Sequence, residues 1–267
     1  MNKNNITVGI PFYQQTIPEE FILAIDSILN QTLQADEIHL IQDGKINVSL
    51  NKVVDNYLSK YNNIRLIKLE KGNVAKSLNQ SIKLTSTKYY ARMDADDISI
   101  SDRLQCQYDF LENNNNIDVV GGWAIEFDED YEESSNFIKK MPEDYSDIIK
   151  FYHYKNPLIH PTVMFRMSFF DKVGYYNESN NYCEDLELWG RSIKSQIGIS
   201  NIQKPLLYHN VKGMFCRRTS MNAIYDQFRS RSVLAADTFK FKVLKFLAIA
   251  FRFMPKILIK YGYKKLR

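Results

Sequence analysis

The sequence predicts an α/β fold in which a mainly parallel central sheet carries helices on both faces. Apolar, strand-like segments alternate with amphipathic, helix-like segments over the first part of the chain, which is typical of parallel strands joined by crossover helices. The 267 residues, 45% of them hydrophobic, are enough to bury the core of at least one large domain. The three cysteines form no Cys-x-x-Cys pair, which argues against a disulfide framework and against a zinc site.

The first part of the chain predicts four strands and three helices. The strands cover 6–12, 37–44, 64–69 and 88–93, and the helices cover 19–30, 50–61 and 74–83. The first strand is expected to end at Pro11 and the second in an Asp-Gly turn. Ligands of parallel sheets bind at the carboxyl ends of the strands. Asp43 and Asp94 lie at two such ends and are therefore candidates for a binding site.

The rest of the chain predicts shorter elements. They are a helix over 103–113, a loop at 113–116 that leads into 117–122, a strand at 161–165, a short helix at 169–174, a helix that begins at Glu184, and a final strand that is followed by 206–211. Acidic residues open the helix at Glu184, where the positive end of the helix dipole favours them. The acidic segment 126–133 is expected to be a solvated loop or hairpin tip, and no function is assigned to it.

The segment 91–97 carries three carboxylates within four residues, Asp94, Asp96 and Asp97. Crowded carboxylates repel one another, and a bound cation offsets that repulsion. In an extended segment Asp94 and Asp96 point to the same side, which suits a divalent metal. The alternative is a solvated acidic turn that caps a helix starting near Ile98. Beside the functional pair Asp94 and Asp96, Asp97 is expected either to orient its neighbours or to open the next helix.

The charge is distributed unevenly along the chain. Residues 240–267 hold nine Lys or Arg and no acidic residue, which leaves 26 basic and 31 acidic residues, a balance of −5, in the part before them. A basic tail of this kind favours an anionic surface, either lipid or nucleic acid. The N-terminus shows no apolar segment of signal-peptide length, and with the odd number of cysteines this favours a protein of the reducing cytoplasm.

These residues resemble the family-2 glycosyltransferases, nucleotide-sugar enzymes of the Rossmann-like GT-A fold, over roughly residues 6–210. The matching motifs, in order, are Val8 to Tyr13, Ser27 to Thr32, Ile41 to Gly44, Ala75 to Asn79, Ala91 to Asp97 and Glu184 to Trp189. The resemblance implies that 1–100 bind the nucleotide sugar and that 101–211 bind the acceptor and supply the base within the same domain. Residues 212–267 are expected to form a basic loop and an amphipathic, membrane-associating helical tail.

The resemblance also implies which residues bind the donor and the metal. The donor-binding residues are Pro11, Phe12, Asp43, Lys76, Arg92 and Asp94, with Arg217 and Arg218 closing over the diphosphate. Asp96, together with Asp94, is expected to ligate Mn²⁺ or Mg²⁺, which would bridge the donor diphosphate and stabilise the leaving group. For Asp43 the alternative is an ordinary residue of an Asp-Gly turn.

The pair at 184 and 185 resembles the catalytic-base motif of the family. Asp185 is expected to take the proton of the acceptor hydroxyl, and Glu184 to orient the acceptor. The alternative is that both acids only satisfy N–H groups at a helix N-terminus. His160 and Trp189 are expected to contact the acceptor, although a structural histidine and a core tryptophan are equally compatible with the pattern.

The chain departs from the family pattern at three places. Gln42 replaces the first of two Asp residues that usually end the second strand, and Lys71-Gly72-Asn73 replaces an Asn-x-Gly loop. His209 lies outside the usual Tyr-Arg-x-His arrangement, so whether it ligates the metal or only ends a strand stays open. Lys212 is a further cation of the loop that follows.

The basic tail at 239–267 has a cationic, amphipathic helical pattern. Its longest apolar run, 246–251, is far shorter than the roughly 20 residues of a spanning helix, so the tail is expected to lie on an anionic membrane surface. The alternative is a helix packed on the body with its lysines outward. Nucleic acid is not expected as a partner, because the body has no recognised binding motif or stacking platform.

The resemblance is strongest to bacterial enzymes that extend undecaprenyl-diphosphate-linked sugars for O-antigen, capsule or exopolysaccharide. It implies an inverting, metal-dependent transfer of a hexose, Gal or Glc, from a UDP-sugar to a lipid-linked N-acetylhexosamine in β1-3 linkage, on the inner face of the plasma membrane. Alternatives are an N-acetylhexosamine donor, a lipooligosaccharide or protein acceptor, and a catalytically idle assembly partner. The oligomeric state cannot be inferred from the sequence.

Overall fold

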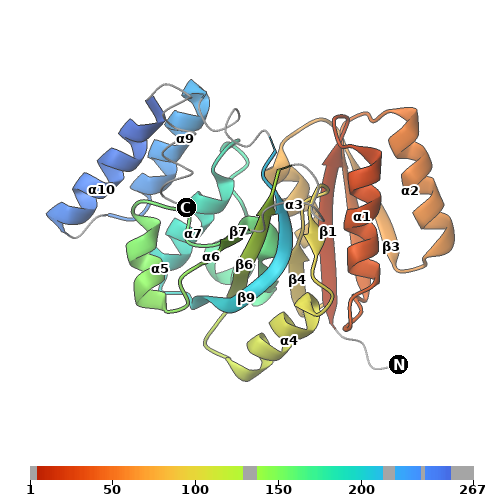
Figure 1. The fold of residues 1–267 in the computed structure, drawn as a ribbon, viewed down its shortest axis with the longest axis horizontal. Helices are drawn as coiled ribbons and strands as arrows, with labels where there is room; N and C mark the ends of the chain where they lie inside the picture. The colour runs from red at the N-terminus through yellow and green to blue at the C-terminus, as the bar shows by residue number, and fades with distance from the viewer. Residues whose placement is uncertain (1–4, 129–136, 213–219, 236–237, 254–267) are drawn as a thin grey trace.

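The computed structural model describes residues 5–128, 137–212, 220–235 and 238–253. They form a mixed sheet with the strand order β3-β2-β1-β4-β8-β6-β9-β5, and β7 pairs with β6. Helices cover both faces of this sheet, and α9 and α10 lie at the end far from α1 and α2 (Figure 1). The α/β fold predicted from the sequence is confirmed.

The N-terminal part of the sheet is parallel. It contains β1 (Ile6–Tyr13), β2 (Glu37–Asp43), β3 (Ile64–Leu69) and β4 (Tyr89–Arg92), connected by α1 (Pro18–Leu29), α2 (Val48–Lys60) and α3 (Val74–Lys83). The predicted elements are confirmed, with ends shifted by at most two residues. The Asp-Gly turn after β2 is also present, and Gly44 adopts φ +76°, which a side chain would disfavour.

Pro11 lies inside β1, so the prediction that it ends the strand is wrong. The pairing of β1 with β4 stops at Gly9, whose carbonyl accepts from Met93 N. Successive residues of a strand present their backbone polar groups to alternate sides, so Pro11 also faces the β4 side, where the ladder has already ended. The missing N–H of Pro11 therefore breaks no ladder bond, and β1 continues beside β2 to Tyr13.

The C-terminal part of the sheet is joined to the first by an antiparallel strand. β8 (Met164–Arg166) runs antiparallel to both β4 and β6 (Val119–Phe127), and β6 pairs in parallel with β9 (Ile199–Asn210). β7 (Phe137–Lys139) is antiparallel to β6. The predicted strand at 161–165 begins later than expected, because η1 (His160–Thr162) forms a 3₁₀ turn before β8.

The segment after the three carboxylates is a strand and not the start of a helix. β5 (Ile98–Ser99) pairs antiparallel with Leu207 and Tyr208 of β9. The next helix, α4, begins only at Arg103. The alternative in which Asp97 opens a helix near Ile98 is therefore wrong, because a partner strand distant in sequence captures this segment.

The remaining helices are α4 (Arg103–Asn113), α5 (Tyr145–Tyr152), α6 (Ser168–Val173), α7 (Glu184–Lys194), α9 (Met221–Ser232) and α10 (Phe239–Ala250), followed by the 3₁₀ turn η2 (Phe251–Phe253). α5 was not predicted, whereas α4, α6 and α7 begin within one residue of the predicted positions. Within the described ranges, no helix is long and apolar enough to cross a membrane.

Two apolar layers hold the helices against the sheet. Alternate residues of one strand enter different layers: Tyr89 and Ala91 pack on the side of α1 and α2, and Tyr90 packs on the side of α3 and α7. This alternation is the pattern of a sheet buried on both faces. It leaves the carboxyl ends of the parallel strands as the edge where polar side chains gather.

Candidate active site

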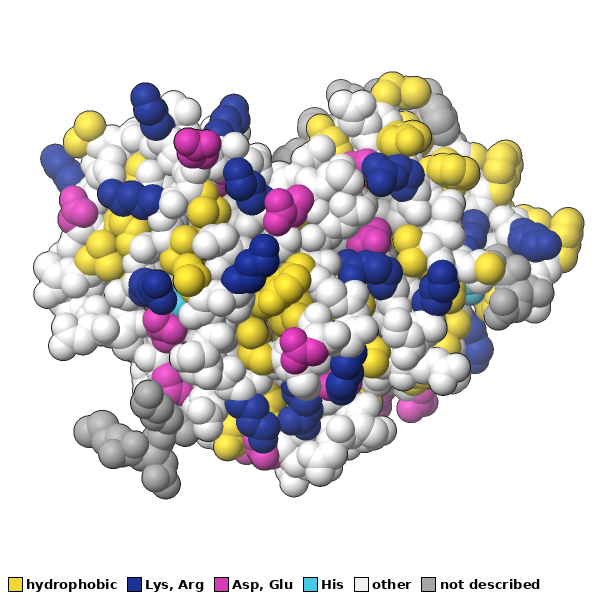
Figure 2. Space-filling model, turned by 180° about the vertical axis from the view of Figure 1, so that it is seen from behind, with side chains coloured by type: hydrophobic (Ala, Val, Ile, Leu, Met, Phe, Trp, Pro, Cys, Tyr) yellow, Lys and Arg dark blue, Asp and Glu magenta, His cyan; other side chains and the backbone are white. Residues whose placement is uncertain are grey.

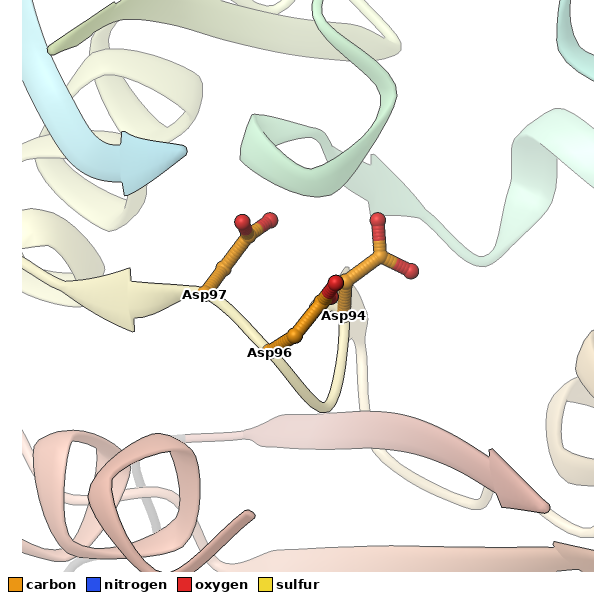
Figure 3. Close-up of side chains that lie close together, drawn as sticks. All are labelled: Asp94, Asp96 and Asp97. Atoms are coloured by element: carbon orange, nitrogen blue, oxygen red, sulfur yellow. The ribbon is translucent and has the colours of Figure 1, made fainter. Parts of the chain in front are cut away.

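The three carboxylates converge at the end of β4. Asp94, Asp96 and Asp97 each offer an oxygen, and these oxygens lie within 4.8 Å of one another. Figure 3 shows the three side chains rising from one side of the loop. The sequence pattern suggested an extended segment, but the chain turns at 95–96. The turn brings Asp97 to the same cluster, which an extended segment would not do.

Asp97 is the buried member of the cluster. Its Oδ1 accepts from Asn210 N at 2.8 Å, at the end of β9, and its Oδ2 finds no hydrogen-bond donor among the described residues. Burial, followed by the charges of Asp94 and Asp96, raises the pKa of Asp97 well above its usual range. A buried carboxylate oxygen aimed into an acidic cluster is a group that a cation would stabilise.

The donor set fits a hard divalent cation. Carboxylate oxygens are the ligands that Mg²⁺ and Mn²⁺ prefer, and the cluster offers one such oxygen from each of three residues. The predicted ligands Asp94 and Asp96 thus lie together, and the geometry adds Asp97 to the candidate ligands. His209 is the next-to-last residue of β9, one residue before the Asn210 that bonds Asp97.

Arg92 is a buried cation of the site. Its Nη1 and Nη2 donate to the two oxygens of Asp94 at 2.8 and 2.5 Å, a bidentate pair that fixes this carboxylate. Arg92 also interacts electrostatically with Glu184 and Tyr176. Arg92 therefore lies between the acidic cluster after β4 and the acidic pair that opens α7. Its guanidinium is engaged with protein carboxylates, whereas the sequence predicted a donor-binding role.

Asp185 is held in one orientation at the start of α7. Its Oδ2 accepts from Asn156 Nδ2 at 2.5 Å, and its Oδ1 accepts from Leu186 N at 2.7 Å. The first bond ties α7 to the segment after α5. The second bond is the contact with an N–H group at the helix N-terminus that was considered as an alternative to a catalytic role. One donor on each oxygen fixes the carboxyl plane, so the capping contact and a catalytic role are compatible.

Glu184 is buried beside Asp185. Burial, and then the neighbouring Asp185, raises the pKa of Glu184 to about 8. His160 Nδ1 lies 3.8 Å from Glu184 Oε1, and His160 Nε2 is hydrogen-bonded to Tyr176 Oη at 2.8 Å. Burial and the nearby Arg92 lower the pKa of His160 well below its usual range. Near neutral pH this corner thus holds a neutral imidazole and a largely protonated carboxyl.

The pKa of Glu184 predicts a pH dependence of stability. The pKa is higher in the folded protein than the ordinary value of 4.5, so the folded state retains a proton that the unfolded chain releases. This stabilisation is complete below about pH 4.5 and is lost as the pH rises toward 8, by up to about 1.4 kcal/mol per pH unit. Glu184→Gln stays neutral. In metal-free protein, the Tm of Glu184→Gln relative to wild type should therefore increase from pH 5 to about pH 8.

The control for this measurement is Glu19→Gln, which changes an exposed glutamate at the start of α1. Its Tm should follow the wild-type Tm across the same pH range. A Tm difference for Glu184→Gln that stays constant with pH would show that Glu184 is ionised throughout and that burial does not retain its proton.

A second polar cluster lies at the end of β2. Asp43 Oδ1 accepts from Gly72 N at 2.6 Å, so the unusual Lys71-Gly72-Asn73 loop folds against this carboxylate. The stem of Lys76 packs over Gly72, where an added Cβ would lie 2.8 Å from Lys76 Cδ. Asn73 caps α3 by accepting from Lys76 N at 2.9 Å. The predicted donor residues Asp43 and Lys76 are thus neighbours.

Pro11 and Phe12 face opposite sides of β1. Pro11 is partly exposed, whereas the ring of Phe12 is buried and stacks on Phe21 at 4.7 Å between centroids. A ligand contact of Phe12 would therefore come from its backbone only. Gln42 donates to the carbonyl of Gly44 at 2.8 Å and stabilises the turn in which Asp43 lies. Arg217 and Arg218 lie outside the described residues, and Lys212 is exposed at the end of the preceding described segment.

Trp189 is a core residue, so its predicted acceptor contact is wrong in this conformation. It has no exposed surface and stacks on Phe165, with ring centroids 5.9 Å apart. The apolar spacing of α7 turns this position inward, as the core alternative proposed. His160 is also largely buried and lies edge-on to Trp189. It contacts Glu184 and Tyr176 of the site, and very little of its own surface is exposed.

No role was predicted for three residues that shape the site, although Asn79 ends one of the matching motifs. Asn79 of α3 donates to Tyr176 O and Glu178 Oε1 and accepts from Tyr176 N, each at 2.9 Å, so it fixes the segment that leads to α7. Asn156 orients Asp185, and Tyr176 holds His160. A buried amide on the apolar face of α3 was a usable signal for Asn79. Asn156 and Tyr176 act across long sequence separations, and no sequence signal identifies them.

Comparison with known proteins supplies the context for this geometry. The family model described as "Glycosyl transferase family 2" matches residues 7–174. The chain is 30% identical over 265 residues to the amylovoran biosynthesis glycosyltransferase AmsE of Erwinia amylovora, covering 97% of this chain and 98% of AmsE. It is also 30% identical over 251 residues to an Escherichia coli protein named UDP-Gal:alpha-D-GlcNAc-diphosphoundecaprenol beta-1,3-galactosyltransferase, covering 91% of this chain and 89% of that protein.

Solved structures show the same fold. The crystal structure of S. aureus TarS 1–349 in complex with UDP-GlcNAc superposes with a TM-score of 0.69 at 18% identity, covering 93% of this chain and 73% of that chain. A longer TarS structure gives a TM-score of 0.65 at 18% identity, and the match spans 40% of it. At this identity the likeness concerns the arrangement of strands and helices alone.

Proposed function

The chain belongs to glycosyl transferase family 2 and is a glycosyltransferase, and we propose that it transfers a hexose, Gal or Glc, from a UDP-sugar to a lipid-diphosphate-linked N-acetylhexosamine, with inversion to a β1-3 linkage. The observation that carries the proposal is the placement of Arg92 between the carboxylates at 94–97 and the pair at 184–185. The E. coli relative, by its name, carries out a transfer of this class. Surface polysaccharide synthesis is the proposed setting.

The proposed chemistry is a single displacement. The acceptor hydroxyl gives its proton to Asp185, and its oxygen forms a bond to the anomeric carbon of the donor. The bond from that carbon to the diphosphate breaks, UDP leaves with the electron pair, and the configuration inverts. The donors from Asn156 and Leu186 aim the Asp185 carboxylate. Glu184, neutral near pH 7 because its pKa is about 8, donates a hydrogen bond that orients the acceptor.

The donor is proposed to bind along the ends of β2 and β4. Asp43 would accept from the N–H of the uracil, and Lys76, beside it, would contact the phosphates. Asp94, Asp96 and Asp97 would hold Mn²⁺ or Mg²⁺, and when bound this ion offsets the negative charge that grows on the leaving diphosphate. Arg92 keeps Asp94 in place for this role.

We also propose that the enzyme works at the cytoplasmic face of the plasma membrane. The acceptor carries a lipid, and the donor is soluble, so the site must lie near a lipid surface. The basic tail at 239–267 supplies cations for anionic headgroups. In the structure α10 also packs on the body, because Phe241 stacks on His153 at 4.5 Å. One side of α10 therefore packs on the body, as the alternative expectation for the tail stated.

A donor screen tests the proposed function. The full chain, Mn²⁺ and a synthetic diphospho-lipid carrying GlcNAc are incubated with UDP-Gal, UDP-Glc, UDP-GlcNAc or UDP-GalNAc in separate reactions. We expect transfer of one hexose, and NMR of the product should show a β1-3 linkage. Transfer of an N-acetylhexosamine would favour the alternative donor. No turnover with any donor would favour an idle assembly partner, and an α-linked product would exclude inversion.

A further inference from the structure

The outer face of α9 is apolar. Met221, Tyr225 and Phe228 are 70%, 62% and 55% exposed. Their spacing of four and three residues places them on one stripe of the helix. Large side chains in a continuous exposed stripe are unusual for a solvated helix and indicate a surface that contacts another apolar phase.

α10 extends this surface. Phe239 and Phe246 are 81% and 68% exposed, and Val243 and Leu247 of the same helix are also exposed. Lys245 Nζ donates to the carbonyl of Arg231 at 2.8 Å, and it also bonds the carbonyl of Leu234, so α10 is fixed against the end of α9. Figure 2 shows hydrophobic side chains gathered over this end of the molecule.

The charges on this surface have one sign. Arg229, Lys240 and Lys242 are exposed on the two helices. The only acid within α9 and α10 is Asp226, which is buried and accepts from Asn181 N at 2.9 Å. Arg229 lies over the ring of Tyr225, 5.8 Å from its centroid, so a cation borders the apolar stripe.

We propose that the outer faces of α9 and α10 together form a membrane-binding surface whose apolar side chains enter the interface of an anionic phospholipid bilayer. Within α9 and α10 the exposed apolar residues are accompanied by exposed cations and by no exposed acid, which is the composition of an interfacial helix. A second copy of the chain is a poorer occupant, because it would place cations against cations. The proposal deepens the membrane placement in the proposed function and rests on it. It makes α9, outside the predicted tail, a membrane-contacting element.

The inner face of α9 connects this surface to the acidic pair. Ser230 Oγ accepts from Asn180 Nδ2 at 2.7 Å and donates to the carbonyl of Cys183 at 3.1 Å. Cys183 directly precedes Glu184. The helix that contacts lipid on one side therefore holds the loop before the acidic pair on the other. This arrangement links the proposed membrane-contacting helix to the loop that precedes Asp185, the proposed base for a lipid-linked acceptor.

The experiment compares vesicle binding of full-length variants. In Tyr225→Ser/Phe228→Ser, co-sedimentation with phosphatidylglycerol-containing vesicles should weaken at least about tenfold, since each side chain contributes apolar area to insertion. The control is Val48→Ser, at a residue that is 71% exposed on α2, and its binding should equal that of wild type. Pure phosphatidylcholine vesicles should bind wild type weakly. Undiminished binding of the double variant would overturn the role of α9.

A second measurement covers the case in which the double variant does not fold. In Tyr225→Trp, the new indole should shift its emission to shorter wavelength when phosphatidylglycerol vesicles are added, whereas Val48→Trp should not. An unshifted Tyr225→Trp spectrum would contradict insertion. If sedimentation velocity shows a wild-type dimer that Tyr225→Ser/Phe228→Ser loses while its vesicle binding is retained, the occupant of this surface is a second copy of the chain. That result would overturn the proposal.

Transfer assays separate this inference from the proposed function. The double variant should lose transfer to an acceptor embedded in vesicles and retain transfer to a short-chain acceptor in solution. Equal loss on both acceptors would contradict a role limited to the membrane. If wild type transfers to neither acceptor, the proposed function fails, and the vesicle-binding and emission results still decide whether α9 and α10 contact lipid.

Discussion

Replacing Asp185 with Asn is expected to lower the rate of sugar transfer by about 10²–10⁴-fold, the usual contribution of a general base. The amide keeps the size of the side chain and a partner for Leu186 N, so α7 should still begin at the same position. It has no carboxylate to take the proton of the acceptor hydroxyl. UDP-sugar affinity, measured by calorimetry, should stay within about threefold of wild type, because the proposed donor contacts lie at β2 and β4.

The matched control is Asp144→Asn, the same change at the start of another helix. Asp144 is exposed at the N-cap of α5, and its side chain makes no capping bond there. Its turnover should equal that of wild type, which shows that an Asp-to-Asn change at a helix start is harmless in itself. Retained turnover in Asp185→Asn would move the base to another group, with Glu184 as the next candidate.

The N-terminal half of the fold was predictable because its signals are local. β3 and α3 have the bounds expected from their apolar spacing alone, since each is a short periodic segment between polar turns. The antiparallel direction of β8 and the existence of the short β5 were not predictable in this way. Their pairing depends on β4, β6 and β9, which are distant in sequence.

The site residues also divide into those recognisable from local sequence and those that depend on contacts between distant segments. Asp94, Asp96 and the pair at 184–185 were identified because each motif is contiguous, and the structure brings both motifs to one buried arginine. That Asp97 joins the cluster depends on the turn at 95–96 and on Asn210. Asn156 and Tyr176 act through single long-range hydrogen bonds, which no periodicity encodes. The orientation of Trp189 could not be predicted, because apolar spacing does not distinguish a side chain that packs in the core from one that lines a binding pocket.

Replacing Asp96 with Asn is expected to weaken Mn²⁺ binding by about 10–100-fold or more and to lower metal-dependent UDP-sugar binding with it. Asp96 is partly exposed and lies between Asp94 and Asp97 in the cluster, so the amide removes one charged oxygen from a three-carboxylate site. Asp94 is a poorer choice for this test. Its loss would leave the buried Arg92 guanidinium without its bidentate partner, and that would destabilise the fold.

Mn²⁺ binding is measured directly, by electron paramagnetic resonance of the free ion, so that the result does not depend on turnover. Asp55→Asn, an exposed change on α2 far from the cluster, serves as the control and should bind Mn²⁺ as wild type does. Wild-type Mn²⁺ affinity in Asp96→Asn would remove Asp96 from the ligands and leave the buried Asp97 as the anchor. Full transfer by Asp96→Asn in the presence of a chelator would contradict metal assistance altogether, and the charge on the leaving diphosphate would then have to be balanced by cations of the chain itself.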